Sequence, residues 1–210
     1  MKIKEPGIDN DLEKCNNIEK LLEQEEVIFR KLFLNTHVEY LTFRNIEFNE
    51  CEFRNVNFTN SNLSKVVFMD IKFIDCDFSN VNITESIIIR TEFINCRLTG
   101  TDFGGSSIKD VKIEDCDAKY INLSFSKISN SIFKNTSFKL GSINETKIKN
   151  LSIDSCDFSS TEILKTPLKD IDFRTSIIDG LKLTGNELNG MIVTEIQAIS
   201  LSKMLGIVIK

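Results

Sequence analysis

The stretch CEFRNVNFTNSNLSKVVFMD, residues 51–70, places a large apolar residue at every fifth position. These residues are Phe53, Phe58, Leu63 and Phe68, and the positions between them are mostly small, polar or charged. An α-helix repeats every 3.6 residues and a strand alternates every 2, so neither element explains a period of five. The stretch therefore predicts a repeated structure in which the chain turns a corner once in every five residues.

The same register continues in both directions without a break. From Phe43 to Leu183 it contains 29 positions, and all of them except Ala118 carry a large apolar side chain. A second register lies two residues earlier and holds mostly small or β-branched residues, such as Cys76 and Ser86. We expect both registers to point inward and the other three positions to face solvent. A fixed period of this kind is the signature of a solenoid, whose stacked units share one continuous core.

Several of the pentapeptides carry the consensus of a known family. CDFSN (76–80), CRLTG (96–100), TDFGG (101–105) and CDFSS (156–160) fit the pattern A/C/S-(D/N)-(L/F)-x-x. Over about residues 41–193 the chain therefore resembles the pentapeptide-repeat proteins. The resemblance implies an all-β solenoid, a right-handed quadrilateral β-helix with four pentapeptides in each coil. The spacing of Cys76, Cys96 and Cys116 by 20 residues agrees with such a coil.

Helical caps are expected at both ends, because an open β-helix would expose an edge and an apolar plane. Residues 1–40 are predicted to form an N-terminal cap, with a helix over 9–26 beginning at Asp9 or Asn10 and strand-like chain over 27–35. Residues 41–193 are the predicted repeat domain. Residues 194–210 are predicted to hold a helix over 194–205, opened by a capping box of Thr194 and Gln197, and then a short strand over 207–210.

The predicted C-terminal helix is apolar on two sides, and such a helix is usually buried on two sides. One stripe contains Leu201 and Leu205, and the other contains Ile196 and Ile199. One stripe can cover the last coil, whereas the other needs a partner. Pentapeptide-repeat proteins of the quinolone-resistance type, which the chain resembles, dimerise through such segments. We therefore expect a homodimer formed through this helix.

Outward positions on one face supply a candidate partner surface. Val67 stacks on Ile87 and Met69 on Ile89, which predicts an exposed apolar patch. Packing between neighbouring side chains along the rod is the alternative interpretation. Further along the same face the outward residues are basic, and we interpret them as a solvated stripe formed by Lys109, Lys127, Lys147, Lys149 and Lys169.

Acidic residues recur along one corner of the predicted rod, namely Asp75, Asp77, Asp115, Asp117 and Asp157. The resemblance implies a role for them, because some members of the family are similar to B-form DNA and bind type II topoisomerases in its place. DNA gyrase and topoisomerase IV are thus the partners implied. Arg97 stands between Asp77 and Asp117, so charge pairing between neighbouring coils is the alternative. The loop insertions of many resistance members are also missing.

Catalysis, a cofactor and a metal site are not predicted. The single His37 precedes the repeats, and no phosphate-binding glycine-rich loop or closely spaced cysteine pair is found. The cysteine column is interpreted as interior filler, with a disulfide or metal site as the alternative. A net charge of −5 argues against direct binding of nucleic acid. Without a signal peptide or a long apolar run, the expected location is cytoplasmic, with no membrane contact.

The sequence thus predicts a non-catalytic, protein-binding rod. In one version it is a DNA-mimicking ligand of a type II topoisomerase. In the other it is a rigid interaction scaffold whose partner has no connection with nucleic acid. A continuous negative stripe on the surface would favour the first version, and a mixed surface would favour the second.

Overall fold

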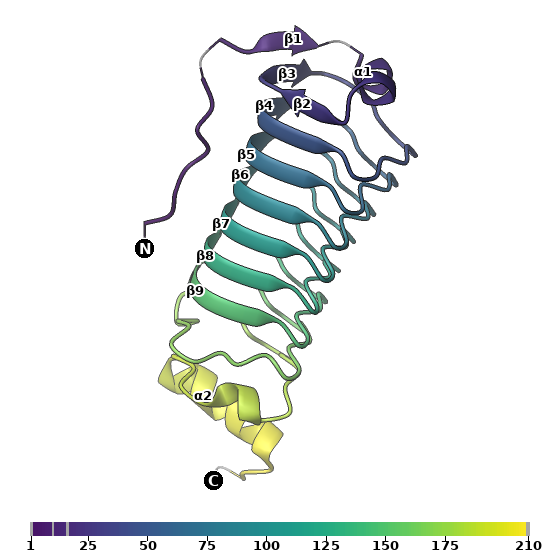
Figure 1. Ribbon diagram of the computed structural model, residues 1–210. Helices are drawn as coiled ribbons and strands as arrows, with labels where there is room; N and C mark the ends of the chain where they lie inside the picture. The colour runs from purple at the N-terminus through teal and green to yellow at the C-terminus, as the bar shows by residue number, and fades with distance from the viewer. Residues whose placement is uncertain (1, 10, 16, 209–210) are drawn as a thin grey trace.

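The computed structural model describes residues 2–9, 11–15 and 17–208, and the chain winds into a parallel β-helix (Figure 1). One eight-residue strand from each coil stacks on the next, and residues 20 apart are paired, such as Phe53 with Phe73. The 20-residue coil expected from the sequence is therefore confirmed. These strands are β4 (Glu47–Arg54), β5 (Val67–Ile74), β6 (Ile87–Ile94), β7 (Ser107–Glu114), β8 (Lys127–Lys134) and β9 (Lys147–Asp154).

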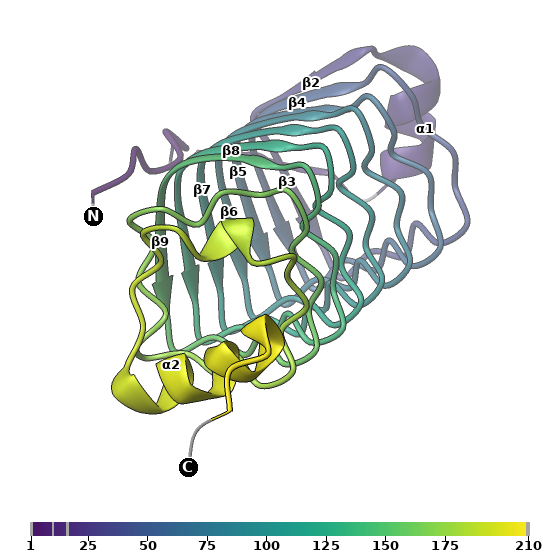
Figure 2. The ribbon, with the colours of Figure 1, turned by 90° about the horizontal axis from the view of Figure 1, so that it is seen from below.

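The corners explain the period of five. Every fifth residue from Arg30 to Asp170 has a positive φ, between 47° and 70°, so the backbone turns through the left-handed region once in each pentapeptide. Of these 29 corner residues, 14 are Asn or Asp and two are Gly, the residue types that tolerate this conformation best. Four corners close one coil, and the view along the rod shows the superposed four-sided outline (Figure 2).

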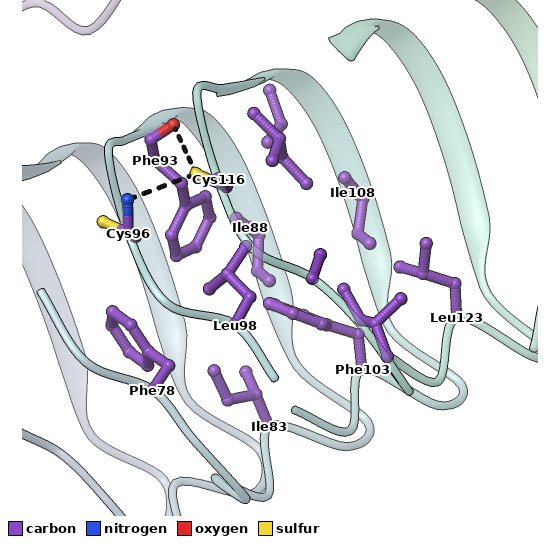
Figure 3. Packing of buried hydrophobic residues seen from close by; sticks show 14 of the residues in the cluster. Phe78, Ile83, Ile88, Phe93, Cys96, Leu98, Phe103, Ile108, Cys116 and Leu123 are labelled. Carbon is purple, nitrogen blue, oxygen red and sulfur yellow. Dashed lines mark hydrogen bonds between the residues drawn. The ribbon is translucent and has the colours of Figure 1, made fainter. Parts of the chain in front are cut away.

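Both predicted inward registers are confirmed. The large register fills the interior with stacked rings, and the ring of Phe73 lies 4.9 Å from that of Phe53 and 5.0 Å from that of Phe93, centroid to centroid. Ala118, the one small residue of this register, is also fully buried. Figure 3 shows other members of the large register, such as Phe78, Phe93 and Phe103, converging in the interior. The rod is therefore filled along its length.

The small register has a second role that the sequence did not reveal. Ser86 accepts a hydrogen bond from the backbone N–H of Val66 (3.1 Å), one coil earlier, and donates one to the carbonyl of Leu63 (3.5 Å). The Cys116 thiol makes the same pair of contacts with the N–H of Cys96 (3.3 Å) and the carbonyl of Phe93 (3.5 Å) (Figure 3). Buried backbone groups need such partners. Where this register carries Ser, Thr or Cys, it therefore also satisfies backbone groups of the preceding coil.

The N-terminal end is built from β1 (Glu13–Cys15), α1 (Ile18–Gln24), β2 (Val27–Phe29) and β3 (Lys31–Leu34). The predicted strand-like chain over 27–35 is confirmed, but a helix over 9–26 is wrong. α1 begins after Asn17, whose side chain accepts from the N–H of Lys20 (2.9 Å), so Asp9 does not cap it, and Asn10 lies outside the described residues. β1 pairs with β3, because only a strand can satisfy the backbone groups along that edge.

At the other end, η1 (Asn186–Leu188) is followed by α2 (Glu195–Ser202) and η2 (Lys203–Leu205). The predicted capping box of Thr194 and Gln197 is confirmed, with both hydrogen bonds present. Gln197 also donates to the carbonyls of Phe173 (2.9 Å) and Ser176 (2.8 Å), which fastens α2 to the last coil. The predicted strand is not formed at 207–208, and 209–210 lie outside the described residues. No helix in the described part is long and apolar enough to span a bilayer.

Candidate partner-binding surfaces

The predicted acidic residues on the outward face are each matched by a cation. Arg97 pairs in register with Asp77 on one side and Asp117 on the other, as the sequence indicated. The alternating column is thus a set of ion pairs between or within coils. These pairs are Asp77 with Arg97 (3.3 Å), Asp117 with Lys119 (3.2 Å) and Asp157 with Lys139 (3.0 Å).

The two predicted acids at the corner itself have neutral partners. Asp75 accepts a hydrogen bond from the side-chain amide of Asn95 (2.6 Å), and Asp115 accepts one from Asn135 (3.0 Å). Among the described residues neither carboxylate has a cation within 4.0 Å, and Asn95 lies between them in the column. The negative charges are therefore interrupted, and together with the ion pairs they give a mixed surface.

Burial and hydrogen bonding act in opposite directions on the fifth predicted acid, Asp157. Burial opposes ionisation of its carboxyl group, but hydrogen bonds from Ser159 and from Lys139 outweigh burial and lower the pKa below its ordinary value. Its Oδ1 accepts from both the N–H (2.9 Å) and the hydroxyl (2.5 Å) of Ser159. A carboxylate held in this way serves the turn that it caps, and little of its charge is left for a partner.

The predicted apolar patch is present on the outer face of β5 and β6. Val67 pairs with Ile87 and Met69 with Ile89, and Ile87 is 43% exposed while the others are half-buried. Polar or charged residues bound the patch in the coils before and after it. The patch is thus small and confined to two coils.

The basic stripe differs from the acidic corner in having no counter-charges. Within the described residues, no carboxylate lies within 4.0 Å of the ammonium group of any of the five lysines, and all five are exposed. Lys127 and Lys147 are paired in register, so their charges lie one coil apart. The nearby Lys165 is different, because it pairs with Glu145 at 2.9 Å. The stripe, which consists of Lys109, Lys127, Lys147, Lys149 and Lys169, therefore attracts anions.

The outer side of α2 is apolar and uncovered. Ile196 is 78% exposed and Ile199 is 48% exposed. Leu201 is only 7% exposed, because it packs within its own chain, so it is removed from the residues expected to form a dimer contact. The side chain of Leu205 lies outside the described part. The helix thus covers the rod with one side and leaves Ile196 and Ile199 free.

An extended N-terminal segment, residues 2–9, lies along the rod and was not foreseen from the sequence. The backbone N–H of Gly7 donates to Asp70 (2.9 Å) and that of Lys4 to Asp110 (3.4 Å), and Arg90 lies between these two corner acids. The guanidinium of Arg90 binds both carboxylate oxygens of Asp70, at 2.6 and 2.5 Å. Figure 1 shows the segment beside the stacked strands. Its polar sequence has no periodicity, so only the buried corner acids mark its course.

The cysteines of the interior are free thiols in this structure. Burial raises the pKa of the thiols of Cys51 and Cys156 to about 11. Among the described residues, no group of three or more His, Cys, Asp or Glu side chains is placed to hold a metal ion. The geometry thus gives these cysteines a packing and hydrogen-bonding role.

Comparison with known sequences identifies the repeats. One profile described as pentapeptide repeats (8 copies) matches residues 40–74, and another described as a pentapeptide repeat region matches residues 66–139. A comparison with curated proteins found no match.

One solved structure shows the same fold. A trypsin-treated form of QnrB1, described as a plasmid-mediated fluoroquinolone resistance protein, is 20% identical with a TM-score of 0.51, and the alignment covers 88% of this chain and 90% of that one. HetL, a pentapeptide-repeat protein involved in heterocyst differentiation regulation in the cyanobacterium Nostoc sp. strain PCC 7120, is 12% identical with a TM-score of 0.32, covering 81% and 96%. At these identities the likeness concerns the fold.

Proposed function

We propose that this chain, which is a pentapeptide-repeat protein, acts as a non-catalytic rod that binds another protein on its outer surface. The observation that carries the proposal is the combination of a filled interior with exposed apolar side chains outside. Stacked rings occupy the space in which a substrate pocket would have to lie. Exposed apolar patches on a soluble fold typically mark contacts with other proteins.

The partner surface that we propose is the apolar patch of Val67, Met69, Ile87 and Ile89. Replacing Ile87 by Asp puts a charge in the middle of this patch without touching the interior. The partner, recovered from the native host with immobilised protein, should be retained by the unmodified chain and lost with Ile87→Asp. The matched control is Lys182→Glu, an exposed change on a different face, which should retain it. Equal recovery with both variants would exclude the patch.

We further propose that α2 joins two copies into a dimer, because Ile196 and Ile199 are the exposed apolar residues of a helix that is otherwise fastened to its own chain. Two-fold dimers are the commonest form of closed assembly. Replacing both isoleucines by Asp should give a monomer in light scattering while circular dichroism shows intact coils. A monomer from the unmodified protein would contradict the proposal.

A type II topoisomerase is a second candidate partner. It is supported by the structural likeness to a fluoroquinolone resistance protein and by the uncompensated carboxylates of Asp75 and Asp115. The ion pairs of the neighbouring acids weigh against an extended imitation of DNA. If this candidate is correct, micromolar protein should inhibit supercoiling by gyrase or protect gyrase from a quinolone. The double substitution Asp75→Lys with Asp115→Lys should abolish the effect. If the unmodified protein has no effect on gyrase, the topoisomerase is excluded and the function as an interaction scaffold is retained.

A further inference from the structure

The hydrogen-bond ladder of the rod stops at one residue. The first residue of each long strand, from Glu47 to Lys147, donates its backbone N–H to a carbonyl 21 residues earlier, at 2.8–3.0 Å. The next residue in this series is Pro167, which has no N–H to donate. The carbonyl of Thr146 therefore receives no bond of this type, and the next coil cannot continue the sheet.

The consequence is an open edge on β9. In the described part of the chain, no backbone hydrogen bond joins residues 147–153 to residues 167–173, although the N–H of Leu168 keeps its bond to the following coil, at the carbonyl of Glu187 (3.3 Å). Ile148 and Leu151 are half-buried, whereas Ile128 and Ser131, their equivalents one coil earlier, are buried. Figure 1 shows β9 as the last arrow of the stack. Unpaired edges of this kind are templates for another strand.

The surroundings of the edge favour one kind of occupant. A hollow of about 490 Å³ adjoins the start of β9, and it is lined by Glu145, Thr146, Lys147, Ile148, Lys165 and Pro167. Lys127, Lys147 and Lys149 flank the edge with no carboxylate in salt-bridge range among the described residues, and Lys169 lies on the next coil. The site thus offers backbone donors and acceptors, apolar side chains that are partly exposed, and positive charge.

We propose that the open edge of β9 binds an extended acidic segment of another protein, which adds to the sheet as a further strand. Its backbone would pair with β9, apolar side chains three positions apart would cover Ile148 and Leu151 on either side of the corner at Asn150, and carboxylates would meet the lysines. A nucleic acid would satisfy only the lysines, because it leaves the backbone groups and the apolar side chains unmatched. The proposal is independent of the topoisomerase and of the dimer.

The test uses the full-length protein and a fluorescent, end-blocked hexapeptide, Glu-Val-Glu-Gly-Val-Glu, which places Val opposite Ile148 and Leu151 and Gly opposite the corner at Asn150. Anisotropy should report binding of this peptide, and a peptide with Lys in place of Glu should not bind. N-methylation of alternate residues removes backbone donors while keeping the charge, and it should weaken binding by about tenfold, since about 1.4 kcal/mol is lost. Equal affinity for methylated and unmethylated peptides, or no binding of either, would overturn the proposal, as would binding of an oligonucleotide in preference to the peptide.

Two protein variants locate the site. Lys147→Glu with Lys149→Glu should reduce the affinity by at least about tenfold, because attraction becomes repulsion, while Lys182→Glu should leave it unchanged. Pro167→Ser restores the N–H that Ser107 supplies at the equivalent position, so it should close the edge, protect the amides of β9 from hydrogen exchange and lower the affinity. Binding that is indifferent to the lysine changes would place the peptide elsewhere and refute the assignment. If the Pro167→Ser variant does not fold, the lysine variants and the methylated peptide still test whether the peptide binds to β9.

Discussion

Truncating Phe73 to alanine should destabilise the rod by about 3–5 kcal/mol, the range for a buried Phe. The upper part of this range is expected. The Phe73 ring is fully buried and lies within 6.2 Å, centroid to centroid, of five other phenylalanine rings. The cavity cannot close easily, because β5 is hydrogen-bonded to β4 and to β6, which fixes the coil spacing.

The matched control is Phe125→Ala. Phe125 occupies a corner with φ 62° and is 64% exposed, so its ring contributes little to the core. The change should cost no more than about 0.5 kcal/mol, as exposed substitutions usually do. Urea unfolding followed by circular dichroism measures both free energies, and the m-values should be equal. Equal losses at the two sites would show that the register does not decide which side chains are inside.

Three further outcomes are expected. Ser86→Ala leaves a buried N–H without its acceptor and should cost about 1–3 kcal/mol in the same assay. Burial disfavours ionisation of Asp70, but hydrogen bonds, chiefly from Arg90, lower its pKa, so its contribution to stability is full above the ordinary carboxyl range. That contribution should be lost as the pH falls below about 4, with faster hydrogen exchange in residues 2–9. A thiol reagent should label only Cys15 rapidly in the native protein and all 6 cysteines in denaturant. Buried thiols are inaccessible and largely protonated, as burial raises the pKa of Cys156 to about 11. Rapid labelling of Cys156 in the native protein would contradict its burial.

The repeat was predictable because each of its requirements is local. A large apolar residue such as Phe73 and a small one such as Ser86 must recur at fixed offsets, and a corner must be tolerated every five residues. The coil length was implied by the resemblance to the family and agreed with the cysteine column, and the capping box at Thr194 followed from a four-residue pattern. These features need no knowledge of distant parts of the chain.

The remaining features depend on contacts between distant segments. The N–H groups of Lys4 and Gly7 meet acids 106 and 63 residues away, and no pattern in residues 2–9 reports this. Two predictions of surface residues are weakened for the same reason, because contacts with other parts of the chain were not visible in the sequence. Asp157 looks like a free surface acid in the sequence, but Lys139 neutralises it across neighbouring coils. Leu201 has the spacing of a contact residue, but its own chain already buries it.

The left-handed corner at every fifth residue means that insertions and deletions of 20 residues and of five residues change the rod in two different ways. Gain or loss of 20 residues would shift everything downstream along the axis by one rung, about 4.8 Å, and would leave every column of side chains in line. Gain or loss of five would instead turn the downstream part by one face, so that the lysine column would no longer continue the apolar patch. Any other length would move the inward registers to the outside. Where one partner contacts the rod on both sides of an insertion or deletion, the number of residues gained or lost during evolution should therefore be a multiple of 20.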